Sequence, residues 1–101
     1  MHRYIKLTEV VSELHVKSEF VDLLESEEVI HLKRSSEGDL LMSSEDVERV
    51  RLALVLMGEL DVNLAGVEVI MHMRESMLAM QHQFAEILDA LVVEARQQPR
   101  R

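Results

Sequence analysis

A long helix is predicted to begin within the stretch Asp61-Val62-Asn63-Leu64-Ala65-Gly66-Val67-Glu68-Val69-Ile70. Asn63 suits the N-cap position, because its side-chain oxygen can accept a hydrogen bond from the free amides of the first helical turn. Val62 and Val67 flank this cap and can pack on each other as a hydrophobic staple. Gly66 weakens a helix by about 1 kcal/mol relative to Ala, so its presence indicates that another backbone packs closely there. The stretch therefore predicts a helix whose first turns are docked.

Downstream of this start, apolar residues recur alternately four and three positions apart, which is the period of a coiled coil. A helix from Leu64 to Ala95 would be about 50 Å long, more than a domain of this size can cover. We expect a second copy of the chain to cover the stripe; the alternative is that the stripe folds back onto helices of the same chain. The predicted dimerisation residues are Gly66, Ile70, Met73, Met77, Met80, Phe84, Ile87 and Leu91. Residues 97–101 are expected to fray.

Two short helices are predicted near the start of the chain, in a helix-turn-helix arrangement. Thr8 is expected to cap a helix that runs through Leu14, and Ser18 is expected to cap a second helix over residues 19–25. Val10, Val11 and Leu14 are the inward residues of the first helix, and Phe20, Val21, Leu23 and Leu24 are the apolar residues of the second.

A small wing is predicted after these helices. Residues 29–32 and 40–41 are expected to be strands, joined by a turn over residues 35–39. Ser43 then begins another helix with Asp46 three positions later, a variant of the capping box in which the two residues satisfy each other's amides. Gly58 is the expected stop of that helix. The sequence thus predicts a mainly helical, all-α fold with a winged helix-turn-helix head and a long C-terminal helix.

Composition narrows the possible functions. The 101 residues carry a formal net charge of -8 and contain seven Met, only three aromatic residues and no Cys. Without Cys there is no disulfide, thiolate nucleophile or cysteine zinc site, and we expect a reducing, cytoplasmic setting. No apolar run approaches the roughly 20 residues of a membrane span, and the N-terminus does not resemble a secretory signal. An acidic chain repels polyphosphates and attracts basic partners, although such a charge also serves solubility alone.

Catalytic and cofactor motifs are not apparent, so we expect no enzyme, no cofactor and no metal site. The five histidines, His2, His15, His31, His72 and His82, never pair at helical ligand spacing. Ser35, His31 and Asp39 are near one another in sequence, but on a predicted wing without an oxyanion loop. Neither a phosphate-binding nor a dinucleotide-binding glycine motif occurs.

The predicted layout resembles that of MerR-type DNA-binding regulators, yet the charge of the second helix does not suit DNA. A DNA reader neutralises phosphates with Lys and Arg and sends donors from this helix into the major groove. Here the helix and its exit carry only carboxylates, with Lys17 the single nearby base, and Asp22 stands where MerR-type heads usually place an arginine. The remaining cations are scattered and could touch phosphate or balance local acids: Lys33, Arg34, Arg49, Arg51, Arg100 and Arg101. Nucleic-acid binding is therefore not the favoured function.

Two motifs carry a closer resemblance. Residues 43–51 (Ser43-Ser44-Glu45-Asp46-Val47-Glu48-Arg49-Val50-Arg51) and residues 60–67 (Leu60-Asp61-Val62-Asn63-Leu64-Ala65-Gly66-Val67), behind a MerR-like head without its basic surface, are similar to the chaperone-modulator (CbpM-type) family. The likeness extends from Leu7 to about Leu91. Together with the apolar stripe, it predicts a head over residues 1–60, a self-associating helix over residues 61–101, and a homodimer that binds no membrane and for which nucleic acid is not the favoured partner.

The resemblance implies a non-catalytic protein that binds the J-domain of a DnaJ-like co-chaperone and inhibits it. J-domains present a basic helix to their Hsp70 partner, so an acidic face with an apolar centre would compete for that surface. The expected partner-binding residues are Glu19, Phe20, Asp22, Leu23, Glu25, Glu27 and Glu28. For the acids, the alternative is a solvated face; for Phe20 and Leu23, it is core packing.

Two other functions fit the same layout. One is a DNA-binding transcriptional regulator of the MerR or heat-shock-repressor type, because residues 63–67 also occur in those relatives. The other is a dimeric structural adaptor that binds neither J-domain nor DNA. The charge of the second helix favours the J-domain modulator over both.

Overall fold

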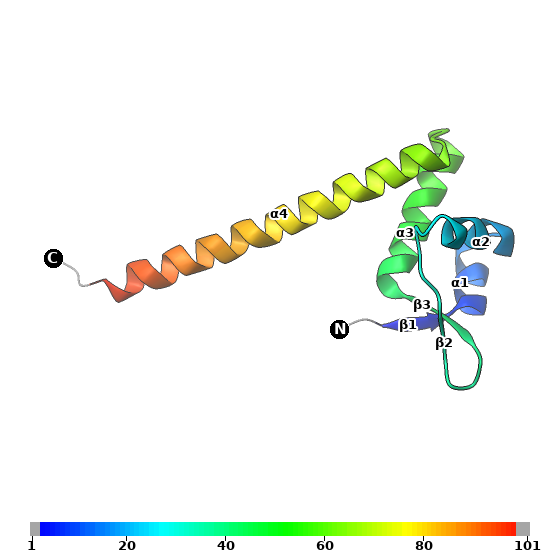
Figure 1. The fold of residues 1–101 in the computed structure, drawn as a ribbon, viewed down its shortest axis with the longest axis horizontal. Coiled ribbons are helices and arrows are strands. Elements are labelled where there is room, and N and C mark those ends of the chain that lie inside the picture. Colours follow the sequence, from blue (N-terminus) through cyan, green and yellow to red (C-terminus); the bar gives the residue numbers. More distant parts are fainter. Residues whose placement is uncertain (1–2, 99–101) are drawn as a thin grey trace. The chain divides into compact units, whose positions relative to one another are not determined.

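The computed structural model describes residues 3–98 and is mainly helical (Figure 1). Within these residues, three short strands and a π-helical segment accompany four α-helices. The described chain divides into two compact units with the boundary between Glu68 and Val69, inside the last helix. We call the first unit, residues 3–68, the head. The elements in order are β1 (Tyr4–Lys6), α1 (Leu7–Leu14), α2 (Ser18–Ser26), β2 (Lys33–Arg34), β3 (Leu40–Ser43), α3 (Ser44–Leu54), η1 (Val55–Glu59) and α4 (Leu64–Gln97).

The head buries one aliphatic core to which every helix contributes. In α2, Val21 and Leu24 are fully buried, three residues apart on the inner side of the helix. Val10 is the buried residue of α1, whereas Val11 and Leu14 are half-buried. The core side chains of the head are Val10, Val16, Val21, Leu24, Ile30, Met42, Val47, Val50, Ala53, Leu56 and Val67. The helical periodicity of the sequence thus predicted the buried positions of both short helices, but it also included Leu23, which is 41% exposed.

A three-stranded antiparallel sheet, in the order β1-β3-β2, forms the wing. The predicted return strand at Leu40 and Leu41 is confirmed and continues to Ser43, and the turn over residues 35–39 is also confirmed. β1 was not predicted, because three residues are too few to show alternation, and its partner β3 lies far along the chain.

The predicted strand over residues 29–32 is wrong, because β2 begins only at Lys33. Ile30 is fully buried in the core rather than paired in the sheet. The next two amides are bonded to side chains: His31 N–H donates to Asp46 at 2.9 Å and Leu32 N–H to Glu25 at 3.2 Å. Side-chain acceptors therefore replace a strand partner in this segment.

The predicted caps at Thr8 and Ser18 are wrong, and both residues lie inside their helices. α1 begins at Leu7 and α2 at Ser18, with Lys6 and Lys17 at the N-cap positions and no side-chain cap bond at either. Lys6 is paired with Leu41 in the sheet, so the helix starts directly where the strand ends. Tertiary pairing, rather than a capping side chain, sets this boundary.

The predicted caps at Ser43 and Asn63 are confirmed. Ser43 Oγ accepts from the Asp46 amide at 3.1 Å, and Asn63 Oδ1 accepts from the Gly66 amide at 2.8 Å. Gly58 is not the helix stop: it lies within η1, and the reversal before α4 is made by Asp61 with a φ of 55°. An added Cβ on Gly66 would lie 2.7 Å from Val62 Cγ1. The close neighbour that excludes a larger residue there is thus a side chain, not another backbone.

Asp46 is the buried charged residue of the head, with 4% of its surface exposed. Its Oδ2 accepts from the His31 amide at 2.9 Å, and its Oδ1 forms an ion pair with Arg49 Nη1 at 2.6 Å. The carboxylate does not return to the Ser43 amide as a full capping box requires. Asp46 instead ties the segment after α2 to the first turn of α3.

Replacing Asp46 with Ala should lower the free energy of unfolding by about 2–3 kcal/mol, because a charged hydrogen bond is lost and the His31 amide is left without its acceptor. Urea denaturation followed by circular dichroism measures this loss. The matched control is Glu48→Ala on the same helix, whose exposed ion pair with Arg51 spans 3.6 Å. We expect the control to change stability by less than about 0.5 kcal/mol. Equal losses in the two variants would contradict the role given to Asp46.

Candidate functional site

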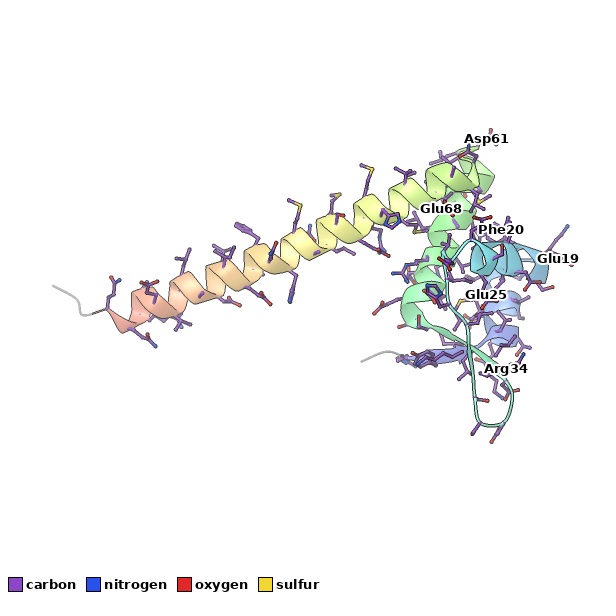
Figure 2. The ribbon with its side chains drawn as sticks, in the orientation of Figure 1. Glu19, Phe20, Glu25, Arg34, Asp61 and Glu68 are labelled. Atoms are coloured by element: carbon purple, nitrogen blue, oxygen red, sulfur yellow. The ribbon has the colours of Figure 1, made fainter. Side chains whose placement is uncertain are left out.

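An acidic surface covers the outer side of α2 and the turn that follows it. Glu19, Asp22 and Glu25 lie on the helix, and Glu27 and Glu28 lie in the turn; all five are exposed. Figure 2 shows Glu19 and Glu25 on α2, with Glu19 projecting from its outer end. None of the five forms an ion pair with another residue of the described chain. We call this surface the acidic face.

The charge of the acidic face is uncompensated along the chain. No Lys or Arg occurs between Ser18 and Leu32, and Lys17 stands at the N-cap of α2. Exposed like charges on one helix and its exit add their potentials at the surface, where they attract a cationic partner and repel phosphate. The local folding of α2 separates this charge from the core, because Val21 and Leu24 face inward while Glu19 and Asp22 face outward.

Leu23 is the exposed large apolar side chain of α2, one turn after Glu19 and one turn before Glu27. It is 41% exposed, whereas Phe20 is half-buried. Both were candidate anchors or core residues; the structure places Leu23 outside the core and Phe20 at its edge. An exposed leucine between carboxylates has the composition of an interface centre with a polar rim.

Glu25 differs from the other acids of the face because it has a structural partner. Its Oε2 accepts from the Leu32 amide at 3.2 Å, across the turn that contains Glu28 in a left-handed conformation with a φ of 61°. The sequence did not indicate this bond, because the donor is a backbone amide seven residues away with no side-chain signal. Glu25 therefore shapes the turn, while Glu19 and Asp22 are exposed and make no such bond in the described residues.

Several Lys and Arg side chains of the head interact with neighbouring groups of the head. Arg34 donates to the Gly38 carbonyl at 3.1 Å, and Lys33 Nζ lies 5.1 Å from the centre of the Tyr4 ring. Lys6 pairs with Asp39 at 3.7 Å, and Arg49 and Arg51 pair with Asp46 and Glu48 on α3. Arg100 and Arg101 lie outside the described residues. Lys6, Arg49 and Arg51 thus balance nearby acids, whereas Lys33 and Arg34 of the wing do not pair with an acid in the described residues.

The apolar stripe of α4 is exposed from Met73 onward. Gly66 and Ile70, at its start, are half-buried. The helix is continuous from Leu64 to Gln97, so the second half of the stripe does not fold back onto the first. The other predicted dimerisation residues have more than half of their surface exposed: Met73 60%, Met77 60%, Met80 67%, Phe84 57%, Ile87 57% and Leu91 55%.

Within residues 3–98, no helix is both long and apolar enough to cross a membrane. No group of three or more His, Asp or Glu side chains in the same residues is arranged to hold a metal ion. His82 pairs instead with Glu86 at 2.9 Å along α4. His2, the first of the five histidines in the sequence, lies outside the described residues.

The helix-turn-helix of α1 and α2, the wing and α3 are the parts of a regulatory head, and a comparison with protein families agrees. The model of the MerR HTH family regulatory proteins matches residues 5–88. The chain belongs to this family. The match covers the head and most of α4, and it establishes a MerR-like helix-turn-helix. No curated protein and no solved structure matches the chain.

Two alanine variants separate the structural acid of the face from a purely surface acid. Glu25→Ala removes the acceptor of the Leu32 amide and should lower the free energy of unfolding by about 1 kcal/mol. Asp22→Ala should leave it unchanged or raise it by a few tenths of a kcal/mol, roughly the helix-propensity difference between the two residues. Urea denaturation of both variants measures the difference. A loss for Asp22→Ala as large as that for Glu25→Ala would contradict this division.

Proposed function

We propose that this MerR-family protein is a non-catalytic inhibitor of a DnaJ-like co-chaperone, which it binds in the cytoplasm through the acidic face. The observation that carries the proposal is the charge of α2. In a helix-turn-helix the second helix is the reading element, and here its exposed side carries carboxylates and no cation. Such a helix is suited to a basic protein surface.

The J-domain is the partner implied by the resemblance of residues 43–51 and 60–67 to chaperone modulators. Its basic helix normally meets an Hsp70 partner, so a protein that covers the helix blocks that encounter. Complementary charge accelerates association and selects the partner, whereas a buried apolar anchor supplies much of the affinity. We assign the first role to Glu19 and Asp22 and the second to Leu23.

Transcriptional regulation is the rival function, and family membership together with the exposed wing residues Lys33 and Arg34 favours it. Binding to duplex DNA would bring α2 against the phosphates or the acceptor-rich edges of the bases. Each carboxylate of the acidic face would then contribute repulsion. The charge of α2 therefore favours the J-domain.

Reversing the charge of Glu19 and Asp22 to Lys should weaken J-domain binding by about 10- to 100-fold, because attraction becomes repulsion at two positions. Isothermal titration calorimetry of the full chain with a recombinant J-domain measures the affinity. The matched control is the Glu9→Lys, Glu13→Lys double variant on α1, which makes the same change in net charge at two exposed positions. We expect the control to bind within about threefold of the unmodified chain.

The same titration tests the apolar anchor and the rival function. Leu23→Ala should weaken binding by about tenfold or more, which corresponds to a loss of at least about 1.4 kcal/mol of binding free energy. Equal affinities for the reversed chain and its α1 control would refute the acidic face as the site. No binding to the J-domain, with salt-sensitive binding to genomic duplex fragments, would replace the modulator with the regulator.

We also propose that the active form is a homodimer held by the stripe of α4. Six exposed apolar side chains from Met73 to Leu91 recur at coiled-coil spacing. Their exposure to water is unfavourable, which favours their burial in an interface. A second copy covers them with the same residues, as a two-fold interface requires.

Replacing Met77 and Ile87 with Gln should convert the dimer into a monomer at about 10 µM, because polar side chains then lie in the middle of the seam. Light scattering after size-exclusion chromatography measures the mass. The control replaces His82 and Glu86 with Gln on the polar side of α4, and we expect it to keep the mass of two chains. A monomeric unmodified chain at the same concentration would refute the homodimer.

A further inference from the structure

α4 carries a second row of apolar residues beside the first. We call Met73, Met77, Met80, Phe84, Ile87 and Leu91 the first seam, and Leu78, Ala85, Leu88, Val92 and Ala95 the second seam. Four members of the second seam directly follow a member of the first, so the second seam lies about 100° further round the helix. Leu78, Leu88 and Val92 are 49%, 47% and 46% exposed. Two adjoining faces of one helix are therefore exposed, and both are apolar except for Arg74 and Gln81 in the second row.

One partner helix covers only one of these faces. In a two-stranded coiled coil each helix buries a single seam, and the positions about 100° away remain in water. Such a dimer of this chain would leave the second seam exposed, where Ala85, Leu88, Val92 and Ala95 follow one another without a polar interruption. A helix that touches two neighbours, at roughly a right angle about its axis, has the geometry of a four-helix bundle.

We propose that the two seams of α4 assemble four copies of this chain into a dimer of dimers, with the first seam holding each dimer and the second seam joining the dimers. The proposal rests on the self-association proposed above. It adds a second, weaker interface, formed by the same helix and closed by symmetry.

Charge complementarity along the second seam favours another copy of α4, in antiparallel orientation, as its occupant. Arg74 lies in the same row, four residues before Leu78, and Asp89 borders the row beside Leu88; both are exposed. When Leu78 of one helix meets Leu88 of another running antiparallel, Arg74 lies opposite Val92 and within about one helical turn of Asp89. Parallel helices would instead place Arg74 against its own copy.

The polar face of α4 fits the outside of such an assembly. Glu75, His82, Glu86 and Asp89 recur on the side away from the first seam, and His82 pairs with Glu86 there at 2.9 Å. With this side in water and both seams covered, each helix of the bundle buries its apolar residues other than Val93 and solvates most of its charged ones. The second seam is richer in alanine than the first, so the interface between dimers is the weaker of the two.

Sedimentation velocity of the full chain, from about 5 to about 200 µM, tests the proposal. We expect the mass to rise from two chains to four over this range. Replacing Leu88 and Val92 with Gln should hold the mass at two chains throughout, while the His82→Gln, Glu86→Gln control should assemble like the unmodified chain. Arg74→Asp should weaken the four-chain form by about tenfold, and adding Asp89→Arg to that variant should restore it.

The outcomes separate this proposal from the homodimer. An unmodified chain that stays at two chains up to about 200 µM would overturn the second interface and leave the dimer intact, whereas a single-chain mass would overturn both. Four-chain assembly of the Leu88→Gln, Val92→Gln variant would also overturn it. If that variant loses J-domain affinity while the unmodified chain never exceeds two chains, the second seam binds the partner and not another copy.

Discussion

The carboxylate of Asp46 accepts a hydrogen bond from the His31 amide and pairs with Arg49, and the head is organised around this buried group. Through it, the segment that leaves α2 is joined to the first turn of α3. Burial removes the water that would hydrate the carboxylate, which is costly for a charged group. The His31 amide and Arg49 replace that water as hydrogen-bond donors. The position of α2, and with it the direction of the acidic face, depends on this connection.

The acidic face is the consequence of a helix with two different sides. Val21 and Leu24 hold α2 against the core, which leaves Glu19, Asp22 and Leu23 toward solvent. In a MerR-type head, this is the helix through which a family member reads DNA. The present chain keeps the scaffold, but the charge on this helix is negative. A negative helix attracts basic surfaces and repels phosphate.

α4 extends the same separation of polar and apolar residues over a much greater length. It has two exposed apolar rows and one charged side. In the proposed assembly, packing of other helices on these rows would add to the stability of α4. A regulatory head on such a helix is suited to acting as part of an assembly, in which more than one acidic face is presented at once.

The sequence by itself determined the features that depend on neighbours within a few residues. These include the caps at Ser43 and Asn63, the inner faces of α1 and α2, the seam of α4, and the acidic composition of α2, because helical periodicity and capping are local. The tertiary structure decided where chain segments distant in sequence meet. β1 exists through pairing with β3, and the amides of residues 31 and 32 bond to Asp46 and Glu25 instead of a strand. The Val62 side chain confines Gly66, and Leu23 rather than Phe20 is exposed. Local patterns carry no information about such partners, since the free energy of a distant contact depends on the fold that brings it together.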